Sequence, residues 1–177
     1  MQRVPFASFE PVLLERLEAL WGRPVNLYRC LANQPQLAAA WTEFFQALRA
    51  ESRTPRALRE LMILRSAQLA GSEYEWAQHL KMARKAGVRE AQIDALARWR
   101  GSAEFDARER ACLELQEAVV AGRVGDEVYA ECARHFGHGE YVELTLTAAA
   151  YVMVPRVLEA LRVPLDDDIR DHAPRLD

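Results

Sequence analysis

A glutamate and a histidine stand four residues apart in the stretch GSEYEWAQHLKMARKAG, residues 71–87. On a helix, Glu75 and His79 would lie on one face, one turn apart. An imidazole beside a carboxylate can give and take protons near neutral pH. However, Ser72 and Glu75 also match the S-x-x-E pattern of a capping box, whose side chains satisfy backbone amides at the start of a helix. The spacing therefore leaves two interpretations open: a proton-transfer site, or a capped helix with a packing histidine.

Almost every other segment also predicts helix. Apolar residues recur at helical spacing, and Thr54 with Pro55 indicates a helix start. No run of alternating β-branched residues bounded by turns predicts a strand. The sequence therefore predicts one all-helical domain over residues 1–177, with an extended acidic tail at 166–177. The predicted helices cover residues 9–21, 24–31, 36–50, 54–71, 72–86, 90–98, 126–136 and 140–161, and a further one follows a loop at 98–106.

The composition excludes several classes of protein. The formal net charge is −3 and the arginines are spread along the chain, which argues against a nucleic-acid-binding face. The N-terminal residues MQRVPFASFE lack the apolar core of a signal peptide. No stretch has the roughly 18 consecutive apolar residues of a membrane span. We therefore expect a cytoplasmic protein that binds neither nucleic acid nor membrane.

The three cysteines are Cys30, Cys112 and Cys132. They form no CxxC pair, and their spacing from the histidines matches no zinc site. We expect reduced, buried thiols, and we expect no metal.

Three segments in order resemble the carboxymuconolactone decarboxylase family, in the superfamily that includes the alkylhydroperoxidase D proteins. These are ELMILR at 60–65, AGSEYEWAQH at 70–79 and AGVRE at 86–90. The resemblance is densest in a core motif region, residues 54–98. It implies the all-α fold of that family, a small-molecule substrate, and a homo-oligomer (dimer, trimer or hexamer) with pockets close to subunit contacts. The aromatic stripe of Trp41, Phe44 and Phe45 is a candidate contact surface or part of the core.

The peroxidase branch of the family has a glutamate, a CxxC pair and a histidine. On this chain, the resemblance aligns the glutamate with Glu60 and the histidine with His79, but Ser72 and Glu75 occupy the two cysteine positions. Dithiol peroxide reduction needs a thiolate and a resolving thiol, and serine and glutamate supply neither. An antioxidant peroxidase is therefore the disfavoured alternative.

The decarboxylase branch lacks the cysteine pair and resembles cofactor-independent lyases acting on a carboxylated lactone. The resemblance implies that His79 transfers the proton, with Glu75 or Glu60 orienting it or sharing the proton, and that no cofactor takes part. Arg65 could bind a substrate carboxylate, because a guanidinium group forms bidentate pairs, or it could form a surface salt bridge.

The remaining candidate residues each have a structural alternative. Tyr74 and Trp76 could line the substrate pocket or belong to the core, and Ser72 could contact substrate or only cap the helix. If all of these side chains are structural, the protein is a non-catalytic ligand-binding or assembly protein. The sequence alone does not decide between these functions.

Overall fold

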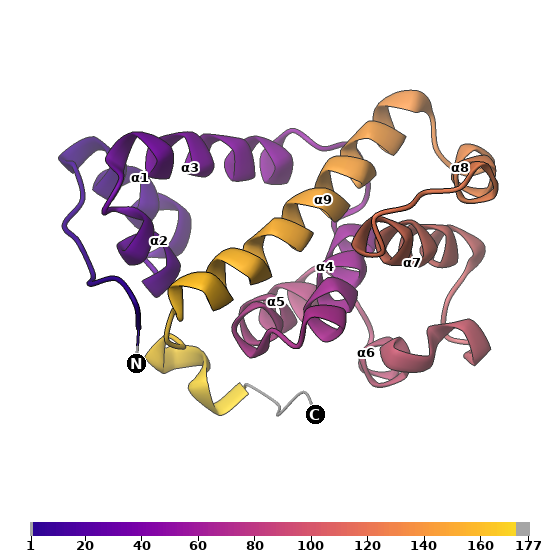
Figure 1. Cartoon of the computed structure of the whole chain (residues 1–177). Coiled ribbons are helices and arrows are strands. Elements are labelled where there is room, and N and C mark those ends of the chain that lie inside the picture. The colour runs from indigo at the N-terminus through magenta and orange to yellow at the C-terminus, as the bar shows by residue number, and fades with distance from the viewer. Residues whose placement is uncertain (1, 173–177) are drawn as a thin grey trace.

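The computed structural model describes residues 2–172, and all regular secondary structure in that range is helical (Figure 1), which confirms the all-α prediction. Helix α4 lies in the middle, with α1 to α3 at one end of the molecule and α7 and α8 at the other. The elements are α1 (Pro11–Trp21), α2 (Asn26–Leu31), α3 (Pro35–Ala50), α4 (Arg56–Ala70), α5 (Glu73–Lys85), α6 (Glu90–Ala95), the 3-10 helix η1 (Leu96–Gly101), α7 (Ala107–Val120), α8 (Asp126–Ala133), α9 (His138–Leu161) and the 3-10 helix η2 (Asp167–His172).

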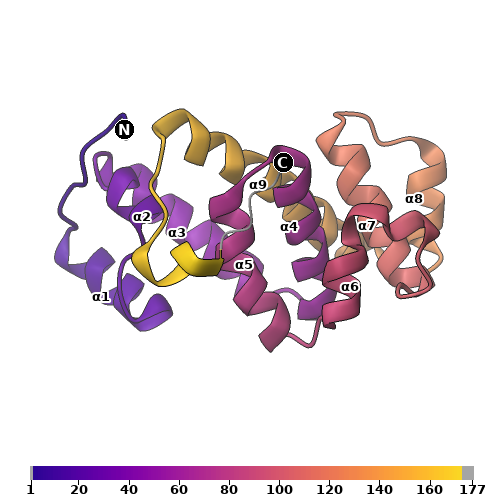
Figure 2. The ribbon, with the colours of Figure 1, turned by 90° about the horizontal axis from the view of Figure 1, so that it is seen from below.

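Helix α4 is the centre of the fold. It packs against α5, α7 and α9 (Figure 2), and every residue from Leu58 to Ala67 except Arg65 is buried. A helix surrounded in this way cannot direct its polar side chains to solvent. Any charged residue on it therefore needs a partner inside the protein.

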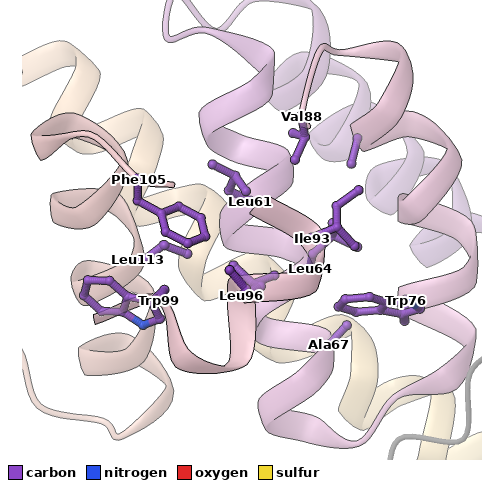
Figure 3. Close-up of a cluster of buried hydrophobic side chains, with 12 residues drawn as sticks. Leu61, Leu64, Ala67, Trp76, Val88, Ile93, Leu96, Trp99, Phe105 and Leu113 are labelled. Atoms are coloured by element: carbon purple, nitrogen blue, oxygen red, sulfur yellow. The ribbon is translucent and has the colours of Figure 1, made fainter. Parts of the chain in front are cut away.

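The largest apolar cluster lies between α4, α5, α6, η1 and α7 (Figure 3). Leu61 and Leu64 of α4 meet Trp76 of α5 and Leu113 of α7 there. Trp99 is 4% exposed within this cluster and lies in η1. The prediction of a loop at 98–106 was therefore wrong over its first residues, because burial of an aromatic ring favours an ordered turn.

Two predicted helix starts have different outcomes. Ser72 caps α5, since its hydroxyl oxygen accepts the backbone N–H of Glu75. Thr54 does not cap α4: Pro55 occupies the cap position without a side-chain bond. Glu143 of α9 instead accepts the backbone N–H groups of Arg53 and Thr54, both at 2.9 Å.

The C-terminal segment differs from the predicted extended tail. Asp166 is 1% exposed, and the following residues form η2 up to His172. The Asp166 carboxylate accepts hydrogen bonds from Arg23, the Asn26 backbone, Tyr74 and Gln78, which explains why an acidic residue is buried here. Residues 173–177 of the predicted tail lie outside the described residues.

Helix α9 is long and apolar enough, by length and composition, to cross a membrane. The central helix of a soluble domain passes the same test, so this is weak evidence for a span. One face of α9, from Leu144 to Leu158, is buried against the rest of the fold.

Replacing Leu64 tests the central place of α4. Leu64 is 0% exposed, so we expect Leu64→Ala to lower the free energy of unfolding by about 2–5 kcal/mol through lost burial and a cavity. Leu69→Ala is the matched control, because Leu69 lies on the same helix but is 41% exposed. We expect that variant to change stability by less than about 1 kcal/mol. Urea unfolding measures both values, and equal losses would contradict this role for α4.

Candidate active site

Glu60, His79 and Glu75 lie in a row across the contact between α4 and α5. The Nδ1 atom of His79 is hydrogen-bonded to Oε2 of Glu60 at 2.8 Å. On the other side of the ring, Nε2 lies 3.3 Å from Oε1 of Glu75. Glu60 is 0% exposed, Glu75 is 2% exposed and His79 is 6% exposed. The three residues aligned by the family resemblance therefore do converge, in a site shielded from bulk water.

Glu60 is held ionised despite its burial. Burial alone would raise the pKa of Glu60, but His79 and Arg56 together lower it below its ordinary value. Arg56, four residues earlier on α4, donates its Nε–H to Oε1 of Glu60 at 2.6 Å. An ionised Glu60 carboxylate can only accept a hydrogen bond, so Nδ1 of His79 must be the donor. In the neutral imidazole the single ring proton is therefore on Nδ1, and the lone pair on Nε2 faces Glu75.

Glu75 differs from Glu60 because its environment favours the protonated form of the carboxyl group. Its backbone N–H is bound by Ser72, but its carboxylate does not complete the capping box, since the Ser72 N–H donates to Ala67 O instead. Oε1 of Glu75 is buried without a hydrogen-bond partner among residues 2–172. Burial raises the pKa of Glu75 to about 7, with the charge of His79 opposing and that of Glu60 adding to the shift. Glu75 therefore holds a proton up to neutral pH, as an acid catalyst requires.

Tyr151 of α9 packs against the ring of His79. Its ring meets that of His79 edge to face, with 4.9 Å between centroids. Pro155 lies inside α9 and has no N–H, so it cannot bond to the carbonyl group of Tyr151 four residues earlier. The hydroxyl of Ser66 donates to that carbonyl at 2.7 Å. This bond joins α9 to α4 at the level of the site and fixes the position of Tyr151.

A small pocket opens on His79 and Glu75, with a cavity volume of about 50 Å³. Its polar wall includes Arg49 of α3 and Gln78 of α5, beside the phenol of Tyr151. Glu60 does not line it, so the ring of His79 separates Glu60 from any guest. The apolar wall consists of Val25, Leu27, Tyr28, Trp41, Phe45, Met82 and Val154.

Asp166 fixes one side of this pocket. Its Oδ2 accepts the Tyr74 hydroxyl at 2.5 Å and the Gln78 side chain at 3.0 Å. Tyr74 and Gln78 both line the pocket, and burial together with Asp166 raises the pKa of the Tyr74 phenol. Tyr74 is therefore a neutral wall residue, held by the segment that follows α9.

Three of the other candidate residues lie outside the pocket. Arg65 donates to Glu117 at 2.7 Å, so it forms the salt bridge that was its structural alternative. Trp76 belongs to the apolar cluster of Figure 3, and Ser72 caps α5. Tyr74 alone of the four predicted substrate contacts lines the pocket.

The cysteines are buried and lie outside the pocket lining. Burial raises the pKa of all three thiols, that of Cys132 to about 11. Thiols with such pKa values are poor nucleophiles at neutral pH. Among the described residues, no group of three or more His, Cys, Asp and Glu side chains is arranged to hold a metal ion.

Sequence reasoning missed Tyr151, Arg49, Gln78 and Asp166. Pro155 inside a long apolar helix was the one signal for Tyr151, because it frees a carbonyl in the middle of the helix. Gln78 next to His79 carried no signal of its own. Arg49 lines the pocket and Asp166 binds its wall residues Tyr74 and Gln78, both from segments far away in the sequence, and no local pattern indicates such contacts.

The raised pKa of Glu75 predicts a pH-dependent loss of stability. Between its ordinary value of 4.5 and about 7, folded Glu75 keeps a proton that the unfolded chain has released. The free energy of unfolding should therefore fall as the pH rises through this range and level off above it. Glu75→Gln cannot titrate, so the stability of wild type relative to this variant should fall by roughly 3 kcal/mol across the window.

Urea unfolding between these pH values measures the difference, with Glu73→Gln, an exposed glutamate on the same helix, as the matched control. The titration of Glu60 does not overlap this pH range, because the pKa of Glu60 is lowered below its ordinary value of 4.5. A difference for Glu75→Gln that stays constant with pH would contradict the proposed protonation state.

Comparison with known proteins shows which family and which fold the chain resembles. The family model described as "Carboxymuconolactone decarboxylase family" matches residues 35–118, which include the predicted core region 54–98. No curated protein matched the sequence. Several solved structures share the fold, as their TM-scores show, but at identities that carry no function.

A cysteine-to-alanine variant of the debrominase Bmp8, in complex with 2,3,4-tribromopyrrole, is 20% identical with a TM-score of 0.80, over 94% of this chain and 90% of that chain. A peroxidase-related protein from Ralstonia eutropha JMP134 is 16% identical with a TM-score of 0.81, over 95% and 94%. ATU0492 from Agrobacterium tumefaciens, a protein of unknown function, is 23% identical with a TM-score of 0.70, over 76% and 93%. Over residues 35–118 the chain is therefore similar to the carboxymuconolactone decarboxylase family, and it shares its fold with these solved structures.

Proposed function

We propose that this protein is a cofactor-independent lyase, or a related proton-transfer enzyme, acting on a small carboxylated or lactone compound. The observation that supports it is the row of Glu60, His79 and Glu75, with the ionised acid behind the ring and the protonated acid beside the pocket. Two carboxyl groups whose environments push their pKa values apart are typical of an acid–base pair.

The proposed reaction is loss of carbon dioxide followed by protonation of carbon. The bond to the leaving carboxylate breaks, and its electron pair moves into the substrate to form an enolate. Glu75, with His79 beside it, then delivers a proton to the carbon that lost carbon dioxide, and water returns a proton to the site. Glu60 stays ionised throughout and stabilises the positive charge that His79 gains when it shares the proton.

The walls of the pocket suit such a substrate. Arg49 offers positive charge for a substrate carboxylate, the role that guanidinium chemistry made possible for Arg65. Burial raises the pKa of Tyr151, with Glu75 and Glu60 adding to the effect, so its phenol stays protonated and can donate to an enolate oxygen. The aromatic and aliphatic wall excludes water from the intermediate.

The peroxidase alternative gains support only from the names of structural neighbours. One fold can carry unrelated reactions, so the site decides. Here Ser72 caps a helix, Glu75 is a buried acid and the three cysteines lie outside the pocket lining. These placements favour proton transfer over thiol chemistry.

We also propose that the protein forms a homo-oligomer through α9. Val142, Leu146 and Met153 are each at least 40% exposed, and helical spacing places them along one side of α9. Exposed apolar residues in such a row are typical of a contact surface. Phe44, at 38% exposed on α3, could extend it, whereas Phe45 is buried and Trp41 packs against the core.

Replacing His79 tests the proposed proton transfer. His79→Gln removes the imidazole that lies between the two glutamates, so we expect loss of carbon dioxide release from small carboxylated lactones. Helicity by circular dichroism should be unchanged, because glutamine keeps much of the volume. His135→Gln is the matched control. His135 follows the end of α8, pairs with Glu131 of that helix and does not line the pocket. The activity of this variant should equal that of wild type.

Full activity in the His79→Gln variant would contradict the mechanism. Binding of such lactones without turnover by the wild-type protein would indicate the non-catalytic ligand-binding alternative.

A peroxide-consumption assay separates the lyase from the peroxidase. We expect no consumption of organic hydroperoxide with a dithiol reductant, because burial raises the pKa of all three thiols. Replacing Cys30, Cys112 and Cys132 together by serine should leave lyase turnover in place. Peroxide turnover by wild type that disappears in this triple variant would support the peroxidase instead.

A further inference from the structure

Behind Tyr151 lies a second, much smaller cavity, lined by three arginines. Arg49 comes from α3, and Arg56 and Arg59 come from the first turns of α4. Its volume is about 10 Å³, which is room for roughly one water-sized particle. Arg49, Phe45 and Tyr151 line both this cavity and the larger pocket, so the two adjoin.

Arg59 is buried without a carboxylate partner. It is 5% exposed, and its Nη1 donates to the carbonyl oxygen of Leu48 at 2.7 Å. Its Nε is buried with no hydrogen-bond partner among residues 2–172, and no carboxylate in that range forms an ion pair with it. A guanidinium group in this state is costly, because neither its charge nor its full set of donors is satisfied.

The nearby carboxylates are occupied elsewhere. Glu60 pairs with Arg56 through one oxygen and with His79 through the other. Oε2 of Glu143 accepts the backbone N–H groups of Arg53 and Thr54, in the segment that precedes α4. Burial and the charge of Arg56 lower the pKa of Arg59, and Glu143 and Glu60 compensate only in part.

The position of these arginines on α4 adds to the cost. The first turn of a helix carries partial positive charge and favours acidic side chains. The first turn of α4 has no acidic residue, and Arg56 is its first residue. An unpaired buried charge and a basic first helical turn both go against ordinary stability rules, and such departures are typical of functional sites. An anion in the cavity would supply the missing charge and an acceptor for Arg59.

We propose that the cavity lined by Arg49, Arg56 and Arg59 binds a small, singly charged anion. The chemistry fits either a free halide ion or one carboxylate group of a molecule that reaches in past Tyr151 from the larger pocket. This proposal does not depend on lyase activity, because it rests on the buried guanidinium group of Arg59 and on the two arginines that line the same cavity. In the lyase, the cavity would fix the negative end of the substrate beside His79.

Bromide provides a direct probe, because its anomalous X-ray scattering distinguishes it from water. Crystals of the wild-type protein soaked in sodium bromide should show an anomalous peak in contact with Arg59. Arg59→Gln should lose the peak, whereas Arg98→Gln, the same change at an exposed arginine in η1, should retain it. A wild-type cavity that holds only water at high bromide concentration would overturn the proposal.

Solution measurements keep the test open if Arg59→Gln does not fold. Chloride NMR line broadening by the wild-type protein should disappear on addition of bromide, and Arg59→Lys, which keeps the charge, should weaken the broadening without abolishing it. Displacement of chloride by acetate would assign the site to carboxylates as well, and no displacement would restrict it to halides. Broadening unaffected by bromide would contradict a specific site.

Discussion

The structure depends on one glutamate, Glu60, whose carboxylate is buried out of reach of bulk water. Glu60 is fully buried on α4, the helix that contacts α5, α7 and α9. An unpaired carboxylate in such a place would cost several kcal/mol, so its two oxygens must be matched. Arg56 supplies one partner from the same helix, and His79 supplies the other from α5. These bonds fix how α5 lies on α4, and therefore where the imidazole faces.

The rest of the site follows from that pair. With Nδ1 bound to Glu60, the ring presents Nε2 to Glu75 and the pocket. Tyr151 lies against the ring edge to face, at a point where Pro155 and Ser66 join α9 to α4. Asp166 fixes the wall formed by Tyr74 and Gln78. Helices α4, α5 and α9, together with Asp166 in the segment after α9, thus build the site in which one histidine lies between a charged and a neutral acid.

The sequence predicted those parts of the molecule that have a local signal. Helical periodicity gave the helices, and the convergence of Glu60, Glu75 and His79 was expected from the family resemblance. Ser72 was ambiguous between cap and contact, and the structure places it at the cap. Arg65 could not be judged, because only the approach of α7 brings Glu117 to it. A residue's type does not reveal which distant charge the fold will place beside it.

The same reasoning explains two failures at the ends of elements. Asp166 belongs to an acidic run that indicates a solvated tail, yet four donors from elsewhere in the chain bury it. Thr54 has the residue type of a cap, but Pro55 occupies the cap position, and Glu143 binds the backbone N–H groups of Arg53 and Thr54. In both cases a long-range hydrogen bond replaced the local pattern, and only coordinates show such bonds.

The most direct test of the central claim is a pH titration of the glutamate side-chain carboxyl carbons by NMR. Glu60→Gln and Glu75→Gln identify the two resonances. The account predicts that the Glu75 carboxyl titrates near pH 7 while that of Glu60 stays ionised down to below 4.5. If both groups instead lose their protons together near 4.5, the histidine does not lie between a neutral acid and a charged one, and the proposed proton transfer is wrong.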